Sequence, residues 1–272
     1  MNSLIKVTII FLLQLVFIKT HAQSSELINY NFKDTTFIIP DQFKSFSEIN
    51  LERHFKYEIN TSGKESIEYY LFHNKVLVNS DDAIQKNNKI YIHFERDQNL
   101  LLNKNRVILP DGNVLQLNDN DIKEEKDEET DEIVSYYAVK GLVKGAIIEQ
   151  IYLIARQPEL NSTYVFFQDD SPILWCDFEY KYPEHLKFYY KSYNGLGTAN
   201  STFDSISHTN VLSLSDTNIE PFDVNQRYVN INKEIRKFRY KLYENYKTGV
   251  RNFYNYKSFT NDFVNMLEVP MD

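Results

Sequence analysis

The feature that most constrains the fold of this chain is a predicted β-hairpin at residues 106–117, with the sequence RVILPDGNVLQL. Pro110 holds φ near about −65°, and Gly112 permits the positive φ that a type I turn with a bulge requires. Short β-forming runs flank the turn, so the stretch predicts a strand, a tight turn and a second strand. The turn also explains Asp111, which is therefore not a candidate catalytic residue.

Alternating apolar and polar residues predict further strands along most of the chain. The clearest stretches are residues 89–95, 146–155, 175–182, 186–193 and 235–243. The 20 Tyr and 19 Phe residues favour sheet as well, because aromatic side chains fit a pleated, half-buried surface. We expect one or two short helices, and the candidate segments follow Ser80 and Ser258. Together these features predict a mostly β fold, an antiparallel β-sandwich.

The first 22 residues have the pattern of a secretory signal peptide. Lys6 precedes an apolar run at 7–18, and small residues near Ala22 suit cleavage before Gln23. The run is short for a membrane span, so a retained anchor is the less favoured alternative, and the mature chain has no segment long enough to span a membrane. No cysteine stands at the junction, so we do not expect a lipoprotein. We expect secretion across an inner membrane to the periplasm, the outer envelope or the extracellular space.

The charge of the chain argues against nucleic acid as a partner. The formal net charge is −8, and Lys and Arg form no cluster. Residues 119–132 (DNDIKEEKDEETDE) are strongly acidic, and we interpret them as a solvated loop. A calcium loop is the alternative, but the acids are wrongly spaced and no Gly stands where an EF-hand must turn.

Residues with catalytic chemistry form no recognisable motif in this sequence. Cys176 is the only cysteine, so no intrachain disulfide can form. It falls inside a predicted strand, where core packing is favoured over a reactive thiol. No histidines have metal-ligand spacing, although distant ones could still meet in space, and there is no GxSxG sequence. We therefore predict no catalytic, metal-binding or cofactor-binding residues, and a chain that is not an enzyme.

Adjacent tyrosines supply the candidate binding residues. In the pairs at 69–70, 136–137 and 189–190, one ring must face away from the core if the pair lies on a strand. Exposed tyrosines can stack on sugar rings or anchor a partner protein, whereas core and edge packing is the favoured alternative. The candidate surface residues are Tyr69, Tyr137, Tyr189 and Tyr190.

An ordered set of short motifs resembles a known family. The motifs are NSDDAI at 79–84, NKIYI at 88–92, RVILPDG at 106–112, GLVKGAIIE at 141–149 and SPIL at 171–174. In this order they resemble the secreted bacterial domain of unknown function 3857, over roughly residues 52–267. That family commonly precedes a transglutaminase-like, papain-fold domain, in which a Cys, a His and an Asp would carry chemistry. The resemblance implies a β-sandwich with no established activity.

The resemblance also implies a division of the chain. Residues 23–219 would form the sandwich, and residues 220–272 a closing strand and helix leading toward an absent C-terminal domain. Whether the chain is stand-alone or a piece of a longer protein stays open. We expect a non-catalytic module that supports or presents a transglutaminase-like domain or an envelope protein. The alternatives are a carbohydrate- or peptide-binding module that uses exposed tyrosines, and the N-terminal part of a transglutaminase-like hydrolase.

Overall fold

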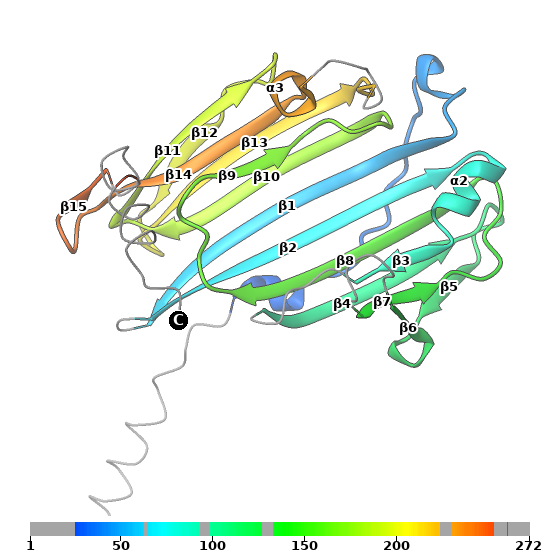
Figure 1. Cartoon of the computed structure of the whole chain (residues 1–272), viewed down its shortest axis with the longest axis horizontal. Coiled ribbons are helices and arrows are strands. Elements are labelled where there is room, and N and C mark those ends of the chain that lie inside the picture. The colour runs from blue at the N-terminus through cyan, green and yellow to red at the C-terminus, as the bar shows by residue number, and fades with distance from the viewer. Residues whose placement is uncertain are drawn as a thin grey trace, which may run out of the picture.

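A long, twisted β-sheet forms the centre of the structure, a computed structural model that describes residues 25–62, 65–92, 98–126, 133–223, 230–252 and 260. Within these residues the long sheet has eight strands (Figure 1). In spatial order they are β12 (Asn200–Asp204), β13 (Thr209–Ile219), β10 (Ile173–Pro183), β1 (Glu48–Ser62), β2 (Glu65–Val78), β8 (Ala146–Arg156), β4 (Asn99–Ile108) and β5 (Val114–Leu117). Neighbouring strands are antiparallel except β1 and β10, which are parallel.

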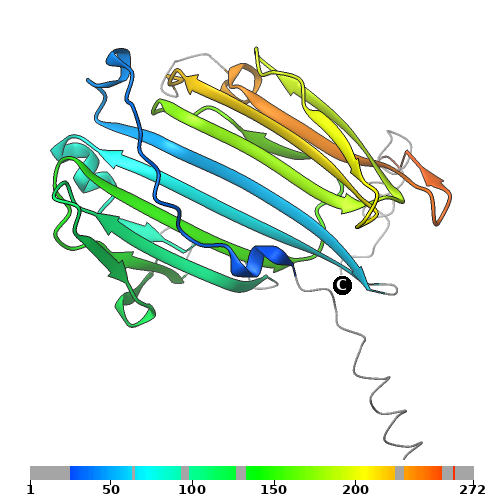
Figure 2. The same ribbon diagram turned by 180° about the vertical axis from the view of Figure 1, so that it is seen from behind.

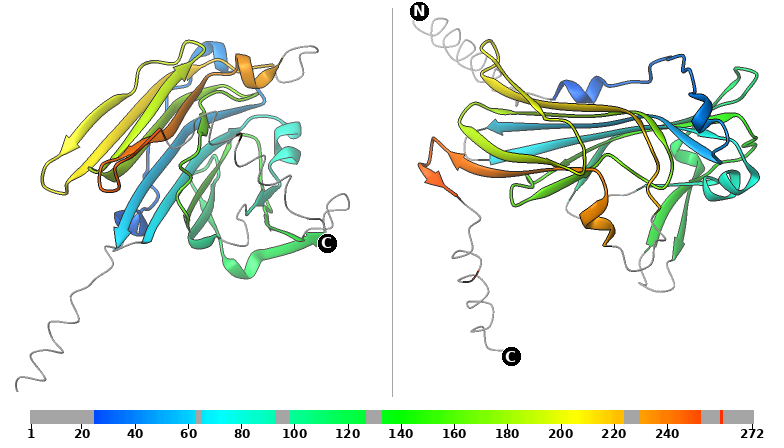
Figure 3. Two further views of the ribbon diagram at one scale, coloured as in Figure 1. Left: turned by 60° about the vertical axis from the view of Figure 1, so that its left-hand side comes forward. Right: turned by 90° about the horizontal axis from the view of Figure 1, so that it is seen from above.

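Two smaller sheets pack on one face of the long sheet. The second sheet contains β9 (Thr163–Phe166), β11 (Leu186–Tyr193), β14 (Lys237–Asn245) and β15 (Val250–Arg251), and the third contains β3 (Lys89–Tyr91), β6 (Ile122–Lys126) and β7 (Ile133–Ala138). Viewed from above, both lie on the same side of the long sheet (Figure 3). The predicted mostly β, largely antiparallel sandwich is therefore confirmed. The strand expected after residue 219 is β14, which pairs with β11, β9 and β15.

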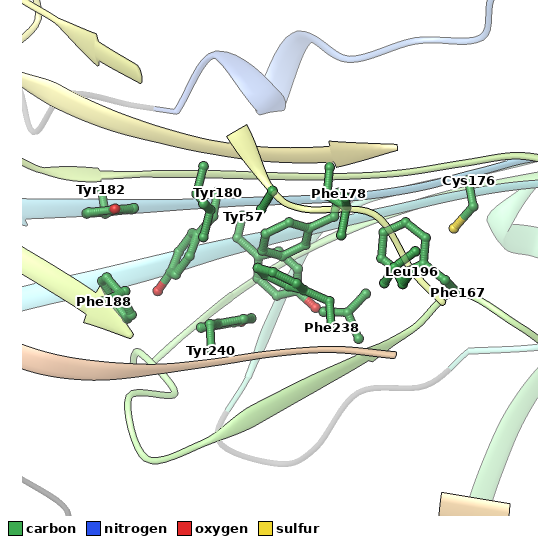
Figure 4. Close-up of a cluster of buried hydrophobic side chains, with 14 of the residues drawn as sticks. Tyr57, Phe167, Cys176, Phe178, Tyr180, Tyr182, Phe188, Leu196, Phe238 and Tyr240 are labelled. Carbon is green, nitrogen blue, oxygen red and sulfur yellow. The ribbon is translucent and has the colours of Figure 1, made fainter. Parts of the chain in front are cut away.

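Aromatic side chains fill the space between the long sheet and the second sheet. Phe178 and Tyr180 on β10 face Phe238 and Tyr240 on β14 (Figure 4). The ring centroids are 4.9 Å apart in both the Phe178–Phe238 pair and the Tyr180–Tyr240 pair. Ring pairs of this kind contribute about 0.5–1.5 kcal/mol each beyond the burial of their area. This core therefore accounts for part of the high Tyr and Phe content.

The hairpin predicted at residues 106–117 is present as β4, a turn and β5. Val107 pairs with Leu115, and Ile108 pairs with Val114. Gly112 has φ 86°, and the Asp111 carboxylate accepts a hydrogen bond from the Asn113 backbone N–H at 3.0 Å. The turn chemistry therefore accounts for Asp111, as predicted.

The first expected helix is present, and the acidic stretch differs from its prediction. The Ser80 side chain caps α2 (Asp81–Lys86) by accepting from the Ala83 backbone N–H. Part of the predicted acidic loop forms the strand β6 instead, because pairing with β7 and packing of Ile122 on the third-sheet core override its polar composition. Residues 1–22 and 127–132, and the helix expected after Ser258, lie outside the described residues except for Thr260. No helix in the described part of the chain is long and apolar enough to cross a membrane.

The opposite face of the long sheet is crossed by an N-terminal strap, residues 25–46, which includes η1 (Glu26–Asn29) and η2 (Asp41–Phe43). Figure 2 shows the strap running across β1, β2, β8 and β4. Phe43 anchors one end in a buried apolar cluster, and Tyr30 and Phe32 pack on a second cluster nearer the other end. The strap leaves the outer face of β10 and β13 uncovered (Figure 2). The outer face thus has a covered half and an open half.

Candidate functional site on the outer face of the long sheet

Polar side chains stand in register across the outer face, opposite the aromatic core. Because side chains alternate along a strand, the residues between the core positions of β10 face outward. One row runs Asp177, His54, His73 across β10, β1 and β2, and a second row runs Glu52, Lys75, Glu149, Arg106 across β1, β2, β8 and β4. Opposite charges therefore lie directly across from each other over four strands.

The covered half contains a cluster of four charged or ionisable side chains, His73, Lys75, Arg106 and Glu149, which we call the closed cluster. Glu149 is fully buried and lies at its centre. Its carboxylate accepts from His73 Nε2 at 2.8 Å and from Arg106 Nε at 2.6 Å, and Lys75 Nζ lies at 3.3 Å. Burial alone would raise the pKa of Glu149, but these three partners outweigh it and lower the pKa. Glu149 is therefore the anion that His73, Lys75 and Arg106 share.

The strap closes this cluster from above. Tyr30 Oη lies 3.0 Å from His73 Nδ1, Lys75 Nζ donates to the Lys33 carbonyl at 3.2 Å, and Arg106 contacts Asp34 at 3.1 Å. Burial lowers the pKa of His73, so its neutral ring donates from Nε2 to Glu149 and accepts at Nδ1 from Tyr30. Each contact satisfies a polar group that burial would otherwise leave unpaired, so the closed cluster holds the strap on the sheet.

His54 stands at the boundary between the two halves. Its ring lies beside that of His73, with centroids 5.0 Å apart and the planes tilted by 32°, and its Nδ1 donates to Asp177 Oδ2 at 2.9 Å. Burial would lower the pKa of His54, but hydrogen bonds to Asp177 and Glu52 outweigh burial and raise it to about 8. Burial would likewise raise the pKa of Glu52. Its contacts with His54 and Lys75 outweigh burial and lower this pKa to about 2. His54 is therefore held as a cation between carboxylates.

The open half contains a groove of about 390 Å³ over β10 and β13. It is lined by Lys56, Trp175, Asp177, Phe178, Glu179, Gly197, Thr198, Asn200, Ser213, Leu214 and Ser215, with no residue of the strap among them. Trp175 is 42% exposed, and its indole Nε1 donates to Asp177 Oδ2 at 3.2 Å. Lys56 Nζ lies 3.8 Å from Glu179 Oε1. We call this feature the Trp175 groove.

Cys176, His54 and Asp177 lie close in the sheet but do not form a catalytic set. Cys176 is fully buried on the inner face of β10, whereas His54 and Asp177 face outward. Burial raises the pKa of the Cys176 thiol far above its ordinary value, so it is not a thiolate near neutral pH. The core role predicted for this cysteine is confirmed.

The four predicted tyrosines do not form one site. Tyr69 on β2 is half-buried, Tyr189 on β11 is 51% exposed, and Tyr190 is half-buried with its ring 6.0 Å from Phe238. Tyr137 was expected at the surface, and this is wrong. It is buried on β7 in the core beneath the third sheet, and its hydroxyl accepts from Asn103 Nδ2 at 2.8 Å. The four residues belong to three different sheets.

The residues of the Trp175 groove were not identified as a site from the sequence. Alternation along β10 already placed Trp175, Asp177 and Glu179 on one face, and that was the available signal. The missing information was that β1 pairs with β10 in parallel, which brings His54 beside Asp177 across 123 residues of sequence. Among the described residues, no group of three His, Cys, Asp or Glu side chains is arranged to hold a metal ion.

A solved structure shares this fold. A structure from Parabacteroides distasonis ATCC 8503, provisionally described as a protease, matches with a TM-score of 0.60 and 14% identity, over 71% of this chain and 40% of that one. At this identity the likeness establishes the fold alone. An M1 zinc metallopeptidase mutant from Deinococcus radiodurans, bound to a Tyr-Ser-Ala substrate, reaches a TM-score of only 0.36 and 8% identity over 71% of this chain and 42% of that one. The chain spans less than half the length of either protein.

A protein-family model matches the part of the chain that contains most of the strands described above. None of the curated proteins matches this sequence. One family model matches residues 66–223, more than half of the chain. That family is described as a domain of unknown function with a solved structure, DUF3857, and it includes the strands from β2 to β13. The resemblance drawn from the ordered motifs is thereby confirmed, and the chain belongs to the DUF3857 family.

Proposed function

We propose that this chain is a secreted, non-catalytic β-sandwich module of the cell envelope that supports or presents a transglutaminase-like partner domain. The observation that carries the proposal is the occurrence of the same fold as 40% of a longer protein, the structure from Parabacteroides distasonis. A fold that forms part of a larger chain there is suited to a supporting role here. Secretion is supported by the signal-like residues 1–22.

The geometry of the ionisable residues also supports a non-catalytic role. The buried histidine of the closed cluster has both ring nitrogens engaged, by Glu149 and by Tyr30. His54 is held as a cation by Asp177 and Glu52, so it lacks the free nitrogen that a general base needs near neutral pH. These side chains are arranged to stabilise the sheet and the strap.

A paired experiment tests the proposal. The purified chain is incubated with casein and a fluorescent primary amine, which detects transglutaminase activity, and with labelled casein, which detects proteolysis. We expect no turnover above buffer. A transglutaminase-like domain encoded in the same genome is then melted alone and with a tenfold excess of the chain, and we expect its Tm to rise by a few degrees because binding stabilises the folded partner.

Two outcomes contradict the proposal. Turnover that is lost in His54→Ala or Asp177→Ala would make the chain an enzyme. If the chain leaves the Tm of every transglutaminase-like domain of that genome unchanged, the proposed supporting role is wrong.

A further inference from the structure

We propose that the Trp175 groove is a binding site for an uncharged oligosaccharide. The site lies on the open half of the outer face and uses none of the four tyrosines predicted from the sequence. It is independent of the proposed supporting role, since it requires no partner domain.

The groove presents a fixed aromatic platform. Trp175 exposes 42% of its surface on a strand in the interior of the long sheet, where most large apolar side chains are covered. Its indole N–H is already bonded to Asp177, so the ring orientation is held before a ligand arrives. A pyranose ring has an apolar face of C–H groups that packs on such a platform, and a ring that is already ordered loses little entropy on binding.

The polar lining of the groove matches hydroxyl groups. The side chains of Ser213, Ser215, Thr198 and Asn200 can each donate and accept hydrogen bonds, as sugar hydroxyls do. The volume of about 390 Å³ lies within the range of small-molecule sites, about 300–1,000 Å³.

The charges of the groove favour a neutral ligand over a charged polymer. Each carboxylate has a cation beside it: His54 Nδ1 is 2.9 Å from Asp177, and Lys56 Nζ is 3.8 Å from Glu179. No excess of either sign is left to attract an acidic or a basic chain. An uncharged saccharide is therefore the occupant that both the platform and the lining fit.

The single tryptophan of the chain makes the site directly observable. The full chain is titrated with maltohexaose, cellohexaose and chitohexaose while tryptophan emission is recorded, and binding is measured in parallel by calorimetry. We expect at least one saccharide to shift the emission saturably, with the same Kd by both methods. An uncharged alanine–glutamine hexapeptide serves as the peptide arm, and we expect it to leave the emission unchanged.

Three variants separate the groove from other surfaces. By calorimetry, Trp175→Ala is expected to weaken saccharide binding at least tenfold, and Trp175→Phe to retain part of the affinity because it keeps a ring. Tyr189→Ala is the matched control, since Tyr189 is 51% exposed on the second sheet, and it is expected to change Kd by less than twofold. Thermal unfolding confirms that each variant is folded.

Any of three results overturns the proposal. They are no binding of any saccharide at millimolar concentration, saccharide binding that Trp175→Ala leaves intact in folded protein, and tighter binding of the hexapeptide than of every saccharide. None of these results depends on the partner domain of the proposed function.

Discussion

The covered and open halves of the outer face both contain charged side chains paired across strands, but these side chains are buried in one half and line a groove in the other. Both are built from opposite charges paired across strands, yet Glu149 and Lys75 are 0% and 2% exposed, whereas Trp175 is 42% exposed. Under the strap, every charge of the closed cluster has a partner from the sheet or from the strap. Over β10 and β13, a similar set of side chains lines a groove instead. The comparison indicates that the strap buries the polar side chains of one half, where they stabilise the fold. The other half stays uncovered and available for a ligand.

The largest expected effect comes from removing the anion of the closed cluster. Glu149→Ala leaves Lys75 and Arg106 buried with their shared carboxylate gone. Lys75 keeps Glu52 and Arg106 keeps the exposed Asp34, but the fully buried partner of both is lost. We expect a loss of about 3–5 kcal/mol in the free energy of unfolding, measured by urea denaturation, because removing one partner of a buried ion pair is strongly destabilising. A loss below about 1 kcal/mol would show that the covered half is not held by this residue.

The next effect is a pH dependence at the boundary residue, His54. Its pKa is raised in the folded state to about 8 from the ordinary 6.5 of histidine, so its protonation stabilises the fold fully below pH 6.5, and this contribution is lost as pH rises through 8. The expected loss is about 2 kcal/mol between pH 6 and pH 9. His73 has a lowered pKa and destabilises only below pH 6.5, and Asp177 and Glu52 have lowered pKa values whose contributions are lost only at acid pH.

The control for this prediction is His54→Gln, which removes the titrating group. Urea denaturation at pH 6 and pH 9 should show a smaller difference for the variant than for the unchanged chain. An equal difference in both proteins would place the pH dependence elsewhere.

A smaller effect is expected where the strap meets the closed cluster. Tyr30→Phe removes only the hydroxyl that bonds His73 Nδ1 at 3.0 Å. We expect a loss of about 1 kcal/mol in thermal or urea unfolding, the ordinary net contribution of one hydrogen bond. Tyr189→Phe, on an exposed ring of the second sheet, is the matched control with no expected change. Equal effects of the two substitutions would contradict the role given to the strap contact.

The smallest effect is expected in the open half. Glu179→Ala removes a carboxylate whose contact with Lys56 Nζ is 3.8 Å and whose side chain is 32% exposed. Pairs of this kind contribute about 0–1 kcal/mol, so unfolding should change little. A loss as large as that of Glu149→Ala would erase the energetic difference between the two halves.

Local signals in the sequence were sufficient for several elements of the fold. The Pro110 and Gly112 turn, the Ser80 cap of α2 and the apolar run of β8 each depend on neighbouring residues, and all were predicted. The acidic strand β6 was missed because its partner β7 and the core beneath it decide its conformation. Tyr137 was misplaced for the same reason: alternation indicates that one of two adjacent tyrosines is buried, and the third sheet decides which.

The candidate site depended on information that a single sequence does not carry. The strap, residues 25–46, has no periodic pattern, so its path over the sheet follows only from contacts such as Tyr30 with His73. The pairing of β1 with β10 joins distant parts of the chain, and no local rule specifies it. Alternation predicted which residues of β10 face outward, but not which strands pair with β10.

Hydrogen–deuterium exchange of the whole chain, with and without the saccharide that binds most tightly, tests the central claim most directly. We expect added protection in peptides covering residues 194–200 and 213–217, which border the Trp175 groove, and unchanged exchange at residues 30–34 of the strap. Protection confined to the strap, or to β11 around Tyr189, would contradict the division of the outer face into a structural half and a binding half.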